Sequence, residues 1–194
     1  MPSLLVALEG LSGTGKTTIA RMLLDELRSK GHRVEIVDTH TNDHNASVVR
    51  EVMRTYLLGH PARTFLCWGL RALQHGKAVK AVGRGTDIVL LDRFWGSTIA
   101  FDSYGNSVPR EVTDWLAVYA GCKPDLTLFF SAPLRLARQR KNADTIKNTD
   151  FSRRVEQGFR NLASEFGWVR IDATQAAEKV EEACLAAITA KLSK

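Results

Sequence analysis

Eight consecutive residues near the start of the chain could bind the phosphates of a nucleotide. Residues 10–17 read Gly-Leu-Ser-Gly-Thr-Gly-Lys-Thr, which satisfies the Walker A pattern, and they lie between an apolar run and a stretch of helical character. The glycines let backbone N–H groups and a helix N-terminus approach phosphate oxygens. Lys16 would then reach the β- and γ-phosphates. The residues expected to bind the nucleoside triphosphate are Gly10, Leu11, Ser12, Gly13, Thr14, Gly15, Lys16, Thr17 and Thr18.

A carboxylate at the end of a second apolar run could complete a metal site. Asp92 follows Ile-Val-Leu-Leu at residues 88–91, the arrangement expected of a Walker B acid. The Thr17 hydroxyl and the Asp92 carboxylate offer the oxygen ligands that Mg²⁺ prefers. Asp92 could instead cap the next helix or pair with Arg93. The sequence therefore indicates Thr17 and Asp92 as candidate metal ligands.

Short apolar runs alternate with longer stretches of helical character along the chain. This alternation is typical of an α/β fold with a parallel sheet flanked by helices on both faces. Ligands of such sheets lie beyond the carboxyl ends of the strands, where the phosphate loop and Asp92 fall. We expect a five-stranded P-loop fold with strands at 4–8, 34–37, 87–91, 126–130 and 168–171, and helices at 18–30, 46–58, 62–82, 110–120, 134–140, 151–165 and 176–192.

Length and composition limit the other classes. The 194 residues are 44% hydrophobic, enough for one sizeable core, and no linker composition divides them, so we expect one domain over 1–194. No apolar stretch approaches the roughly 18 residues of a membrane span, and Met1-Pro2-Ser3 lacks a basic n-region, which favours a cytoplasmic protein. Three widely spaced cysteines argue against a disulfide framework or zinc site.

The net charge of +6 admits small polyanions or nucleic acid as ligands. The basic residues gather without the interleaved aromatic residues of a single-strand platform, which favours phosphate binding within a nucleotide enzyme. A solvated helix face could account for several of them. The clusters are Arg135, Arg138, Arg140 and Lys141, then Arg153, Arg154 and Arg160.

Beyond the phosphate loop, several short segments follow one another in a specific order and spacing. They are Leu8-Glu9-Gly10, Arg50-Glu51-Val52, Arg71, residues 85–94, Ser97-Thr98, Ala100-Phe101, residues 124–130 and residues 169–173. Over most of its length the chain thereby resembles the thymidylate kinases, a family of P-loop nucleoside monophosphate kinases. The resemblance implies transfer of the γ-phosphoryl group of ATP to a deoxynucleoside monophosphate, dTMP to dTDP, with Mg²⁺ and in a homodimer.

The resemblance also assigns expected roles to individual residues. Asp92-Arg93-Phe94 corresponds to the family's Asp-Arg-aromatic motif, in which Arg93 holds the acceptor phosphate with its planar fork of donors. Arg71 matches an acceptor-contacting arginine. The acceptor nucleoside would be held by Ser97, Thr98 and Phe101, although Phe101 could equally be a packing residue of the core.

Two further segments match the family near its ATP site. Residues 138–150 correspond to a short lid, whose Arg138, Arg140 and Lys141 would close over the triphosphate and exclude water. Asp172 falls at the adenine pocket, or simply caps the last helix. The resemblance thus implies Lys16, Asp92, Arg93, Arg138 and Arg140 as catalytic residues.

Four departures from the family pattern concern the acceptor. Residues 39–44 read Thr-His-Thr-Asn-Asp-His and lack an expected phosphate-binding arginine; Ser12 replaces an acidic residue. Cys67 stands where an aromatic ring stacks on thymine, and Asp102 replaces a polar amide or small residue near the base. His40, Asp43 and His44 could contact the acceptor or bind a metal. The acceptor could be another nucleotide, a nucleoside or a different metabolite, and a nucleotide-dependent switch is the alternative to a kinase.

Direct in-line transfer needs no dedicated base when the acceptor is a phosphate, because that oxygen is already ionised near neutral pH. A hydroxyl acceptor would need a carboxylate, and Glu9 and Asp92 are the first candidates.

Overall fold

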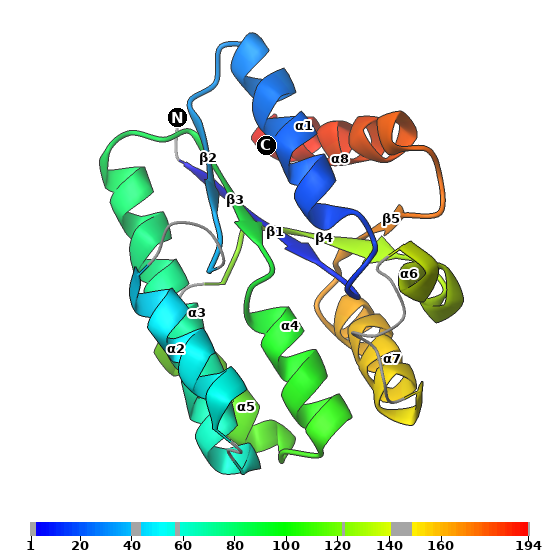
Figure 1. Cartoon of the computed structure of the whole chain (residues 1–194). Coiled ribbons are helices and arrows are strands. Elements are labelled where there is room, and N and C mark those ends of the chain that lie inside the picture. Colours follow the sequence, from blue (N-terminus) through cyan, green and yellow to red (C-terminus); the bar gives the residue numbers. More distant parts are fainter. Residues whose placement is uncertain (1–2, 40–43, 57–58, 122, 141–148, 194) are drawn as a thin grey trace.

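Five parallel strands form one sheet with helices on both faces (Figure 1). The computed structural model describes residues 3–39, 44–56, 59–121, 123–140 and 149–193. The strand order is β2-β3-β1-β4-β5, and this sheet confirms the predicted α/β class. The strands are β1 (Leu4–Glu9), β2 (Val34–Val37), β3 (Ile88–Asp92), β4 (Leu126–Ser131) and β5 (Val169–Asp172).

The central strands are buried because both sides of the sheet are covered. Side chains of a strand alternate between its two faces. Val6 and Leu8 accordingly pack with α1 (Lys16–Ser29) and α8 (Ala177–Leu192), whereas Ala7 packs with α3 (His60–Gly83). The register pairs Leu8 with Asp92, so the ends of β1 and β3 lie side by side.

The helices divide between the two faces of the sheet. α1 and α8 share a core cluster on one face, and α3, α4, α5 and α7 contribute to clusters on the other. The helices lie near the predicted places; they are α1 (Lys16–Ser29), α2 (His44–Thr55), α3 (His60–Gly83), α4 (Trp95–Ile99), α5 (Arg110–Ala120), α6 (Leu134–Arg140), α7 (Thr149–Glu165) and α8 (Ala177–Leu192).

One helical segment has no counterpart in the sequence-based prediction. Residues 95–105 form α4 and a π-helix, η1 (Ala100–Gly105), although their glycines and short polar side chains are weak helix formers. Packing against α7 compensates for this. A Cβ at Gly105 would lie 2.6 Å from Phe151, and one at Gly158 would lie 2.6 Å from Tyr104, so both glycines permit a close approach.

The carboxyl ends of the strands present polar side chains at one edge of the sheet. Glu9, Asp92, Ser131 and Asp172 are the last residues of β1, β3, β4 and β5. This edge is where a parallel sheet binds its ligands. Within the described residues, none of the helices has the length and apolar character to cross a membrane.

Candidate active site

The phosphate loop connects β1 to α1 and is closely packed against neighbouring backbone. Gly13 has a φ of 86°, and a Cβ there would lie only 2.1 Å from the Ala137 carbonyl of α6. Gly10 has a φ of 141°, and a Cβ there would lie 2.6 Å from the Phe130 carbonyl oxygen of β4. Both positions therefore require glycine, and the loop is held in one shape at the N-terminus of α1, where backbone N–H groups attract anions.

Lys16 lies at the first turn of α1 and is only 4% exposed. Its Nζ donates to the Leu11 carbonyl at 2.6 Å and to Thr14 Oγ1 at 3.0 Å. Both acceptors belong to the phosphate loop. The ammonium group therefore lies inside the loop, where the phosphates of a nucleotide would bind.

Thr17 and Asp92 meet across the gap between α1 and β3. The Thr17 hydroxyl donates to Asp92 Oδ2 at 2.6 Å, and Asp92 is buried. A hydroxyl and a carboxylate oxygen side by side match the ligand preference of Mg²⁺. The residues present thus fit the metal site predicted from their sequence positions.

Arg93 has an unusual backbone for a residue with a side chain, because its φ is 61°. The conformation is held from both sides: its N–H donates to the Leu8 carbonyl at 3.0 Å, and its carbonyl accepts from Gln74 Nε2 at 2.8 Å and Arg71 Nη1 at 3.1 Å. Strained backbone of this kind concentrates at functional sites. Sequence reasoning missed Gln74, whose one signal is its position three residues after Arg71 on the same helix face.

The Arg93 side chain bridges the phosphate loop and α4. Its Nη1 donates to the Gly10 carbonyl at 2.9 Å and to Ser97 Oγ at 3.1 Å, and its Nη2 approaches Ser12 Oγ at 3.4 Å. Burial lowers the pKa of Arg93 from its ordinary value, while Glu9 and Asp92 act in the opposite direction. The guanidinium still carries its charge, since arginine is not deprotonated in proteins.

Glu9 organises this segment rather than facing an acceptor. Its Oε1 accepts the backbone N–H groups of Phe94 at 2.9 Å and Ser97 at 3.0 Å, and its Oε2 accepts a very short hydrogen bond from Ser97 Oγ. The side chain is buried at 1% exposure. Both oxygens of this candidate base are thus engaged in fixing the start of α4.

A cavity of about 800 Å³ joins these groups. It brings together most of the predicted site residues from the phosphate loop, β3, α3 and α4. The departures Ser12, Thr39, Cys67 and Asp102 line it too. The cavity is lined by Ser12, Gly13, Gly15, Lys16, Thr17, Thr18, Thr39, Arg50, Met53, Cys67, Leu70, Arg71, Asp92, Arg93, Ser97, Thr98, Phe101, Asp102 and Arg140.

Five of the predicted site residues within the described ranges do not line the cavity: Gly10, Leu11 and Thr14 of the phosphate loop, Arg138 and Asp172. Asp172 Oδ1 accepts from the backbone N–H and the hydroxyl of Thr174, at 3.0 and 2.6 Å, and these hydrogen bonds lower its pKa to about 2. These partners belong to the turn before α8, whose N-cap is Ala176 without a side-chain cap, so Asp172 does not cap that helix. Arg138 lies on α6, and the lid expected at 138–150 falls mostly on 141–148, outside the described residues, as do Lys141, His40 and Asp43.

Arg140 connects the end of α6 to the end of the sheet. Its Nη1 donates to the Ala173 carbonyl at 2.7 Å, and the residue also lines the cavity. Phe101 lines the cavity and also packs in the core, where it lies 6.1 Å from Phe151 and 6.4 Å from Phe159, ring centre to ring centre.

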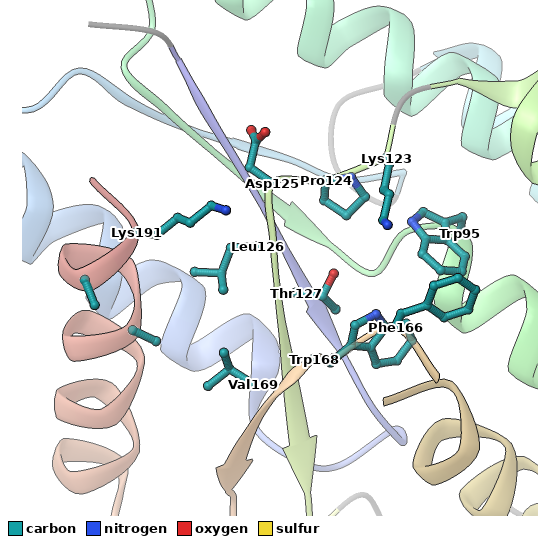
Figure 2. Close-up of a pocket in the computed structure, with 13 residues that line it drawn as sticks. Trp95, Lys123, Pro124, Asp125, Leu126, Thr127, Phe166, Trp168, Val169 and Lys191 are labelled. Atoms are coloured by element: carbon teal, nitrogen blue, oxygen red, sulfur yellow. The ribbon is translucent and has the colours of Figure 1, made fainter. Parts of the chain in front are cut away.

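A second hollow, of about 490 Å³, opens near the amino end of β4 (Figure 2). Trp95, Phe166 and Trp168 form a cluster of edge-on and stacked rings beside it. Asp125, at its rim, accepts the backbone N–H of Leu5 at 2.8 Å. This hollow lies away from the carboxyl ends of the strands, whereas the phosphate loop, Asp92 and Arg93 converge on the larger cavity.

The sequence model of the thymidylate kinase family matches residues 8–184, nearly the whole chain. The match begins immediately before the phosphate loop and includes Asp92, Arg93 and every residue that lines the larger cavity. Kinases of this family transfer the γ-phosphoryl group of ATP to dTMP and form dTDP. Its sequence, its parallel sheet and the convergence of Lys16, Asp92 and Arg93 agree with that assignment: the chain belongs to the thymidylate kinase family and is a nucleoside monophosphate kinase.

Proposed function

We propose that residues 1–194 act as one kinase domain in which Arg93 joins the two substrates of phosphoryl transfer. The observation that carries this assignment is the Arg93 guanidinium, which contacts Gly10 and Ser12 of the phosphate loop and Ser97 of the acceptor side. A positive charge between two polyanions reduces their repulsion and stabilises the charge that develops between them. Arg93 is therefore the residue that holds the acceptor phosphate against the donor.

The other site residues divide between the two substrates in this proposal. The loop residues 10–18 and Lys16 bind the triphosphate of ATP, and Arg140 and Arg138 approach it from α6. Arg71, Thr98 and Phe101 bind the acceptor nucleotide. Ser97 positions Arg93 and Glu9, because its hydroxyl is already shared between them.

Thr17 and Asp92 are the proposed holders of Mg²⁺. Bound there, the metal would neutralise charge on the phosphate oxygens of ATP. Asp92 accepts the Thr17 hydroxyl at 2.6 Å and so keeps both oxygen ligands in place. Asp172 is assigned to the turn before α8, where its hydrogen bonds lie, and not to the adenine pocket.

The reaction requires no general base from the residues of this chain. The acceptor oxygen of a nucleoside monophosphate is ionised near neutral pH. Glu9, the carboxylate considered as a base besides Asp92, accepts the N–H groups of Phe94 and Ser97. Positioning and electrostatics then carry catalysis.

The test is ADP formation from MgATP with each nucleoside monophosphate and nucleoside in turn. Strong stimulation by dTMP, lost in Lys16→Ala, is the expected result. Stimulation by nucleosides alone would identify a nucleoside kinase. Hydrolysis independent of any acceptor would favour a nucleotide-dependent switch.

A homodimer in the cytoplasm is the proposed working form. The support is an exposed apolar surface on α5, where Trp115 and Tyr119 are 62% and 79% exposed and their rings stack 5.3 Å apart. Val112 and Val118 extend this surface, and α5 packs on α3, which exposes Phe65. Contiguous apolar surface of this kind marks protein contacts.

A further inference from the structure

Asp102 is a buried carboxylate that the mechanism above does not use. It lies on the π-helix η1, lines the larger cavity and is only 3% exposed. Its Oδ2 has no hydrogen-bond partner within the described part of the chain. A buried polar oxygen without a donor costs free energy, so a donor from outside the chain would stabilise it.

Polar atoms in the same condition lie on the helix that faces Asp102. Trp68 Nε1 and Arg71 Nε are buried and have no hydrogen-bond partner among the described residues. Their spacing of three residues places them on one face of α3. Cys67 lies on the same helix, and Asp102 and Arg71 both influence its ionisation. Arg71 and Cys67 line the larger cavity together with Asp102.

The position of Asp102 along the cavity matches the base of an acceptor nucleotide. Arg93 marks the phosphate end, and the chain then runs through Ser97 and Thr98 to Phe101 and Asp102 in helical conformation. At about 1.5 Å per residue, the helical stretch from Trp95 to Asp102 spans on the order of 10 Å. This length suits the reach from the 5′-phosphate to the far edge of a base.

We propose that Asp102 is a specificity-determining residue whose carboxylate accepts the N3–H of the acceptor base. The inference rests on the proposed function, since it takes Arg93 as the holder of the acceptor phosphate. Thymine carries that N–H between two carbonyl groups. Cytosine has a lone pair at the same ring position, so its N3 would face a carboxylate oxygen and be repelled. Asp102 therefore selects pyrimidines with a ring N–H.

The test compares binding of dTMP and dCMP to the whole protein in the presence of a non-hydrolysable ATP analogue and Mg²⁺, by calorimetry. Asp102→Asn replaces one acceptor oxygen with an amide donor, which complements cytosine N3. We expect the ratio of the dCMP and dTMP dissociation constants to move towards dCMP by about 10- to 100-fold. Asp25→Asn makes the same chemical change at an exposed position of α1 and should leave the ratio unchanged.

The outcomes separate this inference from the proposed function. Equal weakening of both nucleotides in Asp102→Asn would indicate a purely structural role and overturn the inference, while dTMP binding by the unaltered protein would still support the acceptor. A protein that binds the ATP analogue but neither nucleotide would overturn both. Thermal unfolding of the variant distinguishes a lost fold from altered selectivity, and Asp102→Ala, which removes acceptor and donor alike, should abolish the preference without reversing it.

Discussion

At the scale of single residues, Arg93 has to satisfy two conditions that rarely coincide. Its backbone adopts a left-handed φ of 61°, which glycine or asparagine would tolerate better, while its side chain bridges the phosphate loop and Ser97. The surrounding hydrogen bonds from Gln74 and Arg71 hold the backbone in place. These hydrogen bonds therefore keep the Arg93 backbone in its strained conformation, which sets the position of the guanidinium group.

Replacing Arg93 with lysine keeps the charge and removes the planar fork. We expect Arg93→Lys to lower kcat by at least about 10²-fold, because a lysine cannot contact the loop and the acceptor phosphate together. Steady-state kinetics with dTMP measures this. Arg33→Lys is the matched control, since Arg33 pairs with Asp87 on the exposed surface. A normal kcat in Arg93→Lys would remove Arg93 from the catalytic machinery.

The ionisation of Asp102 gives a second prediction at this scale. Burial raises its pKa to about 6, so the carboxylate is charged above that pH and protonated below it. Only the charged form offers both oxygens as acceptors. The preference for dTMP over its N3-methyl analogue should therefore be greatest near pH 8 and decline through pH 6.

Binding titrations with both nucleotides across this pH range give the required ratio. Both ligands carry the same phosphate group, so the ionisation of that group cancels in the ratio of the two dissociation constants. A preference that stays constant with pH would contradict the participation of the Asp102 carboxylate. The neighbouring groups that also affect this titration are His60, Arg63 and Cys67 of α3, with the polar side chains of Thr64 and Asn106.

Sequence patterns could reveal the groups that face a ligand but not those that support them. The phosphate loop and Asp92 were predictable, because the motif spacing and the position after a strand define them. Glu9 was noticed only as a possible base, and Gln74 was missed. Their roles depend on backbone N–H groups and carbonyls brought together from β1, β2, β3 and α4, which residue spacing alone does not specify.

At the scale of elements, the five strands and seven longer helices were predictable and the α4–η1 segment was not. The strands are continuous apolar runs, as in other buried parallel sheets, and the long helices have apolar faces. Residues 95–105 lack both signals, and their helical form depends on packing against α7. Segments held by tertiary contacts escape local patterns.

The contact between α7 and η1 can be tested through its glycine. A Cβ at Gly158 would lie 2.6 Å from Tyr104, so we expect Gly158→Ala to destabilise the fold by about 1–3 kcal/mol. It should also raise the KM for dTMP, because η1 carries Phe101 and Asp102. Denaturant unfolding and steady-state kinetics measure the two effects.

Gly76 of α3 supplies the opposite case. A Cβ there meets nothing within 4 Å, so Gly76→Ala should stabilise the helix by about 0.5–1 kcal/mol. Equal stability changes of the same sign in the two variants would contradict the close packing of α7 on η1.

At the scale of the whole molecule, the two sides of the sheet have different surroundings. α1 and α8 cover one face, and the helices of the other face include α5 (Figure 1). The Trp115 and Tyr119 rings of α5 stack on each other and are exposed. Nothing in the helix patterns of the sequence identified this surface as an interface. This surface can be recognised only in the structure, which shows that several apolar side chains of α5 are exposed.

We expect the unaltered protein to sediment as a dimer and Trp115→Glu to sediment as a monomer, because a carboxylate in an apolar interface would lose its hydration. Sedimentation velocity at several protein concentrations provides the measurement. Ala186→Glu, at an exposed position of α8 on the opposite face, is the control and should remain dimeric. A Trp115→Glu protein that still forms dimers would exclude the α5 surface as the interface.

The order of the strands has a consequence for how the protein is made. β1 carries the phosphate loop, yet its partners in the sheet are β3 and β4, which begin at Ile88 and Leu126. Contacts between such distant segments form slowly, because a long stretch of chain must close before they can pair. During synthesis the apolar β1 emerges first and must wait for both partners. The nascent chain therefore exposes an apolar strand during the period in which aggregation or chaperone capture competes with folding.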